Sequence, residues 1–249
     1  WTEPYPMATI YCQAHKFEHI QAVLFDKDGT LANVEGYLKK IGIARSRCVP
    51  NQPAAFHAQL LTTFGLTATD IDPTGLLAVG SREENEVATA AHIAATGKGW
   101  IEARAIAHSA FSEAEDRLVP KVEKTPLLEG VRPLLSRLSL AKVKLGIVSS
   151  DLHSQVAEFV EHYSLTDISW YCGAARGFPL KTHPEFLAFA CESLSVSPAR
   201  TLVIGDSAAD LALARQGAAD FLGMVGGWTR SPIIAPDVKT FSDLSQIRC

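Results

Sequence analysis

Two carboxylates one residue apart, directly after an apolar run, constrain this chain more than any other feature. Asp26 and Asp28 follow residues 20–25, whose β-branched and aromatic side chains are typical of a buried strand. Gly29 then lets the backbone turn sharply away. Carboxylates this close repel each other unless a cation neutralises them. The segment therefore predicts either a solvated Asp-Gly turn or a ligand site at the carboxyl end of a strand, where open parallel sheets bind their ligands.

The composition is that of an ordinary globular protein and excludes several classes of partner. Of 249 residues, 47% are hydrophobic and 20% charged, and 23 basic against 27 acidic residues give a net charge of -4. Without a basic excess, no nucleic-acid partner is expected. No apolar run approaches the roughly 18 residues that span a bilayer, so no membrane partner is expected either. Residues 1–7 lack the basic, apolar and small-residue order of a signal peptide.

The cysteines point to a reducing compartment. Five of them are scattered along the chain without the paired spacing of a metal site: Cys12, Cys48, Cys172, Cys191 and Cys249. We expect them to be reduced and mostly structural, in a cytoplasmic protein.

A long helical block interrupts the strand pattern soon after Leu31. Apolar residues recur at helical spacing over 56–64, 83–95 and 100–118, and Gly65 and Gly97 stand where helices would end. A block of some 90 residues is far longer than a crossover between parallel strands requires. The sequence thus predicts an inserted helical domain over 33–123, with 1–32 and 124–249 forming the other domain.

From about residue 126 strands and helices alternate. After an amphipathic helix over 127–138, buried strands are expected at 144–148, 168–172, 201–204 and 219–225, with Asp151 capping one intervening helix and Pro184 in the first turn of another. Five strands alternating with helices predict a mostly parallel sheet covered on both faces. Asp26, Ser149 and Asp206 each follow a predicted strand, so we expect them to meet at one edge of the sheet.

Four short segments, in order, resemble the motifs of the haloacid dehalogenase-like (HAD) superfamily. They are Asp26-Lys27-Asp28-Gly29-Thr30-Leu31, Ser149, Lys181-Thr182-His183-Pro184, which lacks the first proline of the usual Lys-Pro-x-Pro, and Gly205-Asp206-Ser207-Ala208-Ala209-Asp210. The resemblance covers residues 23–225 and implies an α/β fold, with a Rossmann-like, mostly parallel sheet core and an inserted α-helical cap domain.

The resemblance also implies a role for each matching side chain. Asp26 would be the nucleophile that forms an aspartyl-phosphate, and Asp28 the general acid and base. Ser149 would hydrogen-bond a phosphoryl oxygen, with Ser150 as a weaker substrate-binding candidate because strand alternation turns it away. Lys181 would offset the charge of nucleophile and phosphate.

The implied cofactor is Mg²⁺, which prefers oxygen ligands and keeps several waters. Its ligands would be the Asp26 carboxylate, the Asp28 carbonyl and Asp206. Gly29, Thr30 and Asp210 would support the site, Asp210 by orienting the metal's waters or Lys181.

Within the superfamily, the residues favour a phosphatase and leave two alternatives open. The dehalogenase branch lacks the second aspartate of the first motif, so Asp28 argues against it. A phosphonatase would need a cap lysine, and Lys39, Lys40 and Lys98 are not placed by the sequence. A sugar phosphomutase would use the same residues while excluding water. A catalytically silent HAD-like binding protein is the other alternative, against which the intact motifs argue.

The inserted block resembles the helical cap of phosphoglycolate phosphatase-like members, which closes over the site and contacts the leaving group. This implies a small phosphorylated metabolite as the substrate, phosphoglycolate above all, and a monomer or homodimer. The basic run of Lys39, Lys40, Arg45 and Arg47 would either recognise an acidic leaving group or form a solvated helix face. The remaining polar candidates of the block are no better placed: Arg82, Glu84, Asn85, Arg104 and His108.

Overall fold

A computed structural model describes residues 6–249, which form two compact units. The core unit comprises the chain up to Asn33 together with Pro126–Cys249, and the helical unit is Val34–Thr125. The opening segment considered above as a signal peptide lies almost entirely outside the described residues.

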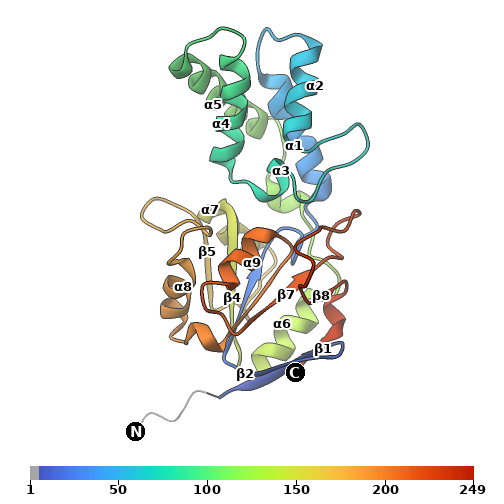
Figure 1. The fold of residues 1–249 in the computed structure, drawn as a ribbon, viewed down its shortest axis with the longest axis vertical. Helices are drawn as coiled ribbons and strands as arrows, with labels where there is room; N and C mark the ends of the chain where they lie inside the picture. Colours follow the sequence, from blue (N-terminus) through green and yellow to red (C-terminus); the bar gives the residue numbers. More distant parts are fainter. Residues whose placement is uncertain (1–5) are drawn as a thin grey trace. The chain divides into compact units, whose positions relative to one another are not determined.

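The core unit is built on a parallel sheet of six strands (Figure 1). The strands are β3 (Ala22–Asp26), β4 (Lys144–Leu152), β5 (Trp170–Ala174), β6 (Thr201–Gly205), β7 (Asp220–Met224) and β8 (Thr240–Phe241), in the order β5-β4-β3-β6-β7-β8. Every neighbouring pair is parallel. The predicted α/β fold is thus confirmed, and β3, whose five residues are all buried, lies inside the sheet between β4 and β6.

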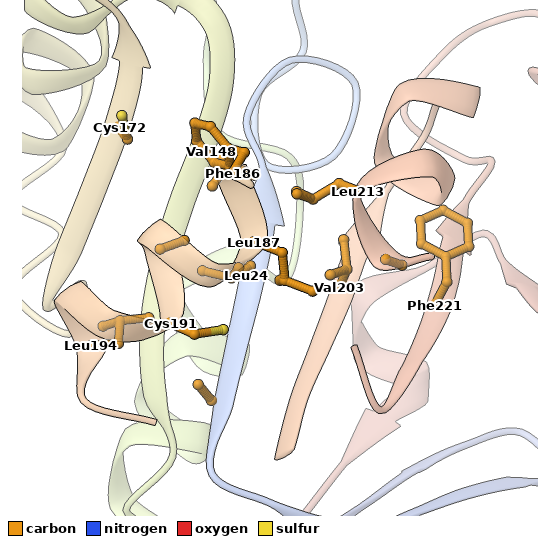
Figure 2. Packing of buried hydrophobic residues seen from close by; sticks show 13 residues of the cluster. Leu24, Val148, Cys172, Phe186, Leu187, Cys191, Leu194, Val203, Leu213 and Phe221 are labelled. Atoms are coloured by element: carbon orange, nitrogen blue, oxygen red, sulfur yellow. The ribbon is translucent and has the colours of Figure 1, made fainter. Parts of the chain in front are cut away.

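Helices cover both faces of the sheet. They are α6 (Val131–Leu140), α7 (His153–His162), α8 (Phe186–Leu194) and α9 (Ala208–Ala214). Figure 2 shows α8 and α9 packing Leu187 and Leu213 against Leu24, Val148 and Val203 of the strands. Strand alternation turns the neighbours of these strand residues to the opposite face. Helices α6 and α7 lie on that opposite face. They belong to the connections from β3 to β4 and from β4 to β5, which advance toward one edge of the sheet, whereas α8 and α9 precede β6 and β7, toward the other edge. Right-handed crossovers in opposite directions place their helices on opposite faces.

A second, small sheet was not predicted from the sequence. The strands β1 (Ala8–Cys12) and β2 (His15–Ile20) form an antiparallel hairpin, and β9 (Ile247–Arg248) pairs with β1. The sequence of β2 is mostly polar and only two of its residues are buried, so it carries no apolar run. The tail after β7 is likewise folded rather than irregular, since it contributes β8, the 3₁₀ turn Leu244–Gln246 and β9.

The helical unit holds five α-helices. They are α1 (Glu35–Cys48), α2 (Ala54–Thr63), α3 (Leu76–Val79), α4 (Arg82–Ala94) and α5 (Trp100–Asp116), followed by the 3₁₀ turn Lys121–Lys124. Ser81 caps α4 by accepting a hydrogen bond from the backbone N–H of Glu84 at 3.2 Å, while the Glu84 carboxylate accepts one from the Ser81 N–H at 2.7 Å. Gly65 and Gly97 have positive φ angles of 82° and 99°, as expected at helix ends.

Three local expectations are wrong. Helix α6 begins at Val131 rather than 127, after Gly130 in the left-handed conformation. Asp151 does not cap α7, because β4 continues through it and Leu152 takes the cap position. Pro184 precedes the first turn of α8, whose cap position is Glu185.

Two observations concern membrane spans and cysteines. Among the described residues, no helix is both long and apolar enough to cross a membrane. All five cysteines are free thiols, and four of them are buried.

Candidate active site

Three carboxylates meet at the carboxyl edge of the sheet. Asp26 is the last residue of β3, and Asp206 directly follows β6. The two strands are paired with Phe25 opposite Ile204, so Asp206 follows one residue beyond the level of Asp26 at the same edge of the sheet. Asp210 reaches the same place from the first turn of α9. One carboxylate oxygen from each of the three lies within 4.8 Å of the others, and all three residues are buried.

A buried lysine balances part of this charge. The Lys181 ammonium, from the loop before α8, forms ion pairs with Asp26 Oδ1 and, at 2.6 Å, with Asp210 Oδ1. Burial alone would lower the pKa of Lys181, but the Asp210 and Asp26 carboxylates outweigh it and raise that pKa above its ordinary value. Lys181 is therefore a permanent cation beside Asp26.

Asp210 is fixed by the helix that carries it. Its Oδ2 accepts hydrogen bonds from the Ser207 backbone N–H at 3.0 Å and from the Ser207 hydroxyl at 2.5 Å, which form the cap of α9. Gly205 leaves room for this carboxylate, because a Cβ at that position would overlap the side chain of Asp210. With Oδ2 occupied by the cap, Oδ1 faces Lys181.

Asp206 is held by two donors from distant parts of the chain. The indole Nε1–H of Trp228 donates to Oδ2 at 2.6 Å, and the Thr30 hydroxyl lies 3.5 Å from Oδ1. Burial, together with the neighbouring Asp26 and Asp210, raises the pKa of Asp206 well above its usual range, while the indole hydrogen bond acts in the opposite direction.

The carboxyl of Asp26 binds a proton more tightly than that of an ordinary aspartate. Burial raises the pKa of its carboxyl to about 7, and the charges of Asp210 and Asp28 add to this, while Lys181 opposes it. A carboxylate with a pKa this high is one that a cation would stabilise strongly.

The residues present fit a divalent metal ion. Three buried carboxylates face one lysine, which leaves an excess of two negative charges in the cluster. All the donors are oxygens, the ligand type that Mg²⁺ prefers. The raised pKa values of Asp26 and Asp206 are the physical mark of that uncompensated charge.

Asp28 lies beside this cluster, with its own lysine. The buried Lys27 ammonium forms an ion pair with Asp28 Oδ1 and lies 3.0 Å from Asp151 Oδ2, at the end of β4. It also lies 5.2 Å from the centre of the Phe159 ring. The Gly29 turn, with φ at 83°, carries the chain away from this pair, and the Lys27 carbonyl accepts the backbone N–H groups of Leu31 and Ala32.

The two predicted serines differ in exposure. Ser149 lies within β4, one residue beyond Val148, which pairs with Asp26, and it is buried. Its hydroxyl accepts a hydrogen bond from the Asp151 backbone N–H at 3.1 Å. Ser150, the next residue of the strand, is half-buried. The substrate-binding roles of both remain predictions.

Sequence reasoning missed two residues of this edge. Lys27 stands in the first motif without an assigned role, although a lysine between two aspartates at the end of a buried strand needs partners. Trp228 follows Gly226-Gly227, and that glycine pair was the signal that a close backbone approach lies there.

Two residues of the basic run, and two further cations of the helical unit, form ion pairs within that unit. Lys39 pairs with Glu35 at 2.6 Å. Arg45 pairs with Glu115 at 3.0 Å and lies 4.3 Å from the centre of the Phe111 ring. Arg82 shares Glu115 and also binds Glu86. Lys98 pairs with Glu102 at 2.5 Å.

Comparisons with known proteins agree with this geometry. A sequence profile described as haloacid dehalogenase-like hydrolase matches residues 20–217. A phosphoglycolate phosphatase of Psychrobacter arcticus is 27% identical over 233 residues, which cover 91% of this chain and 94% of the relative.

Two solved structures show the same fold. One, from Haemophilus somnus and described as a predicted phosphoglycolate phosphatase, superposes with a TM-score of 0.65 at 18% identity, covering 91% of this chain and 97% of the other. The other, from Thermotoga maritima and provisionally described as a β-phosphoglucomutase, gives 0.53 at 18% identity over 83% and 86% of the two chains. Together with the family match over most of its length, the four motifs show that the chain belongs to the haloacid dehalogenase-like hydrolases.

Proposed function

We propose that this hydrolase is a Mg²⁺-dependent phosphatase that cleaves a small phosphorylated metabolite through an aspartyl-phosphate on Asp26. The observation that carries the proposal is the environment of Asp26. Its Oδ1 is paired with the buried Lys181, and its carboxylate belongs to the buried cluster with Asp206 and Asp210. A structural aspartate would be paired one to one, whereas this one lies beside an uncompensated negative charge that a bound cation would offset.

In the first half of the reaction, an Asp26 carboxylate oxygen attacks phosphorus, and the bond between phosphorus and the ester oxygen breaks. Asp28 gives its proton to the departing alkoxide. Lys181 and the hydroxyl of Ser149 stabilise the charge of the transferred phosphoryl oxygens.

In the second half, Asp28 takes a proton from a water molecule that attacks the phosphoryl group. The bond between phosphorus and Asp26 breaks, which releases inorganic phosphate and restores the carboxylate. Lys27, paired with Asp28 and Asp151, fixes the side chain that moves the proton in both halves.

Asp26, the Asp28 carbonyl and Asp206 would hold the metal ion. When bound, Mg²⁺ would neutralise the crowded carboxylates and phosphate and orient them for in-line displacement. Asp210 serves the site through Lys181, whose position it sets.

For the substrate we propose a small, acidic monoester of the phosphoglycolate type. The support is the similarity to phosphoglycolate phosphatases over more than nine-tenths of the chain. The core residues named above would serve any phosphate monoester, so we assign the selectivity to the helical unit, acting as the cap. We place the enzyme in the cytoplasm, in line with its five free thiols.

The test is phosphate release from a panel of small monoesters that includes phosphoglycolate, with Mg²⁺ or with EDTA. Wild type is compared with Asp26→Asn and with Asp220→Asn. Asp220 is the matched control, because it also belongs to the sheet and forms an ion pair with a lysine, Lys239. Its side chain is about one-third exposed, and it is the first residue of β7, at the amino edge of the sheet and away from the carboxylate cluster.

We expect release by wild type and Asp220→Asn alone, and only with Mg²⁺. A requirement for a sugar bisphosphate with little net release would instead identify a phosphomutase. No release from any ester would overturn the proposal in favour of a binding protein.

A further inference from the structure

Trp228 lies deep in the edge of the sheet that carries the carboxylates. Only 7% of its surface is exposed, and its indole Nε1–H donates to Asp206 Oδ2 at 2.6 Å. A buried indole N–H needs an acceptor, and many could serve. Here it takes an oxygen of a carboxylate that stands within the cluster suited to a metal ion.

Three glycines near Trp228 stand where a larger side chain would not fit. A side chain at Gly227 would overlap the Gly29 carbonyl, and one at Gly226 would overlap the carbonyl of Ser242. A Cβ at Gly29 would in turn overlap the indole nitrogen and the Asp206 carboxylate. Glycines in two segments some 200 residues apart thus allow the indole to lie against the first-motif turn.

The hydrogen bond divides the two oxygens of Asp206 between two tasks. Oδ2 accepts the hydrogen bond of the indole, while Oδ1 lies 3.5 Å from the Thr30 hydroxyl, a longer contact. Rotation of the carboxylate about its final bond would break the bond to the indole. Oδ1 is therefore left as the oxygen available for a cation, and its direction is set before the cation arrives.

We propose that Trp228 is a positioning residue for the metal ion, acting through the carboxylate of Asp206. The inference rests on the proposed function, since it takes Asp206 as a metal ligand. It adds a residue from outside the four motifs, supplied by the loop after β7. Indole is neutral at every accessible pH, so it orients the carboxylate without adding a charge that would compete with the metal ion.

The test measures Mn²⁺ affinity directly, from the electron paramagnetic resonance signal of free Mn²⁺ during titration of the protein. Mn²⁺ shares the preference of Mg²⁺ for oxygen ligands. Wild type is compared with Trp228→Phe, which removes the N–H and keeps an aromatic ring, and with Trp228→His, which restores a ring N–H. Trp170→Phe is the control, because Trp170 is partly buried against the core and packs on Phe189, 5.9 Å away between ring centres.

We expect the dissociation constant of Mn²⁺ to rise about tenfold or more in Trp228→Phe, the usual effect of removing a partner of a metal ligand. Trp228→His should recover part of this loss, and Trp170→Phe should bind as wild type does. Thermal unfolding of each variant shows whether it is folded at the titration temperature. If Trp228→Phe is unfolded at that temperature, Trp228→His and Trp228→Gln are compared instead. We then expect Trp228→His, whose N–H lies on a ring as in the indole, to bind Mn²⁺ more tightly than Trp228→Gln, whose N–H lies on a flexible side chain. Equal affinities of these two variants and wild type would overturn the inference.

Unchanged Mn²⁺ affinity in folded Trp228→Phe would overturn the inference and reduce Trp228 to a packing residue. Equal loss in the Phe and His variants would also overturn it, because ring size rather than the N–H would then matter. Absence of Mn²⁺ binding by wild type would instead refute the metal site of the proposed function itself.

Discussion

At the scale of residues, the site consists of two lysines that each hold two carboxylates. Lys181 joins Asp26 to Asp210, and Lys27 joins Asp28 to Asp151. The proposed nucleophile, Asp26, and the proposed general acid and base, Asp28, are close in sequence, and each pairs with its own lysine in the structure. With three carboxylates and one lysine, the cluster around Lys181 carries two negative charges in excess, and Asp206 is its carboxylate without a lysine partner among the ion pairs described above.

The first prediction concerns Lys27. Replacing it by Met leaves the carboxylates of Asp28 and Asp151 facing each other, and breaking a buried ion pair in this way costs about 3 kcal/mol. Urea denaturation of the metal-free protein measures the loss. Lys239→Met is the matched control, because Lys239 also pairs with a carboxylate and lies 5.2 Å from an aromatic ring centre, yet its side chain is 38% exposed.

The control should lose less than about 1 kcal/mol, the usual value for an exposed pair. Equal losses in the two variants would mean that burial of Lys27 does not decide its contribution.

The second prediction concerns pH. The pKa of Asp26 is raised from 3.8 to about 7 in the folded chain. Between these two values the folded state binds more protons than the unfolded state, so this group makes the metal-free protein less stable as pH rises through that window. Bound Mg²⁺ should remove the penalty by stabilising the ionised form.

Thermal unfolding at pH 5 and pH 8, with EDTA or Mg²⁺, measures this effect. We expect Mg²⁺ to raise the melting temperature more at pH 8 than at pH 5. An equal rise at both values would show that Asp26 does not take up protons in the metal-free site.

At the scale of elements, the turn after β3 decides how closely the site can be packed. Gly29 has φ at 83°, and its Cα faces Trp228 and Asp206. Gly217, after α9, has φ at 118° but open space where a Cβ would be. Both glycines have a positive φ, but only at Gly29 would an added Cβ overlap other atoms. A comparison of the two positions therefore separates the cost of backbone strain from the cost of side-chain overlap.

We therefore predict different costs for Gly29→Ala and Gly217→Ala. Both pay about 1–2 kcal/mol for a left-handed alanine, and Gly29→Ala pays about 1–3 kcal/mol more for overpacking. Urea denaturation gives the difference, and weakened Mn²⁺ binding should accompany Gly29→Ala alone. Equal stabilities of the two variants would show that the turn can shift without disturbing the indole.

The elements of the core sheet could be predicted where the sequence carries a continuous apolar run. The strands β3, β6 and β7 are of this kind, and their predicted ranges lie within two residues of the observed ones. The hairpin of β1 and β2 could not be predicted, because β2 is mostly polar with only two buried residues, and β1 also pairs with β9, more than 200 residues away. The cap of α7 was assigned to Asp151 from local pattern alone, whereas Lys27 draws that side chain into the site.

The same distinction holds for the candidate site. Residues in short motifs at strand ends could be listed from the sequence, and the structure brings Asp26, Lys181 and Asp206 together as expected. The indole on Asp206 and the ion pair of Lys27 with Asp151 depend on contacts between separate segments. No local pattern encodes those partners.

At the scale of the whole molecule, the helical unit is inserted between two neighbouring points of the core. The Asn33 backbone N–H donates to the Pro126 carbonyl at 2.8 Å, and Ala32 pairs with Leu127. The core is thus already closed at the base of the insertion, which lies between residues that are hydrogen-bonded to each other.

We predict that replacing Val34–Thr125 by a short Gly-Ser linker leaves a core that folds. It should unfold cooperatively in urea, keep Mn²⁺ binding, and hydrolyse small monoesters with less discrimination than the full chain. A variant that is unfolded by circular dichroism would show that the core depends on the helical unit for its stability.

The insertion also fixes the order in which the ribosome delivers the parts of the core. Strand β3 is synthesised first, but its two neighbours in the sheet, β4 and β6, follow only after the whole helical unit has been made. The helical unit is continuous in sequence, so its helices can pack against one another before β4 and β6 have been synthesised. During that time both edges of β3 are unpaired. A strand that is apolar over four of its five residues and has two open edges is a template for association between chains. The nascent chain is therefore most exposed to aggregation during the interval in which the helices are being translated.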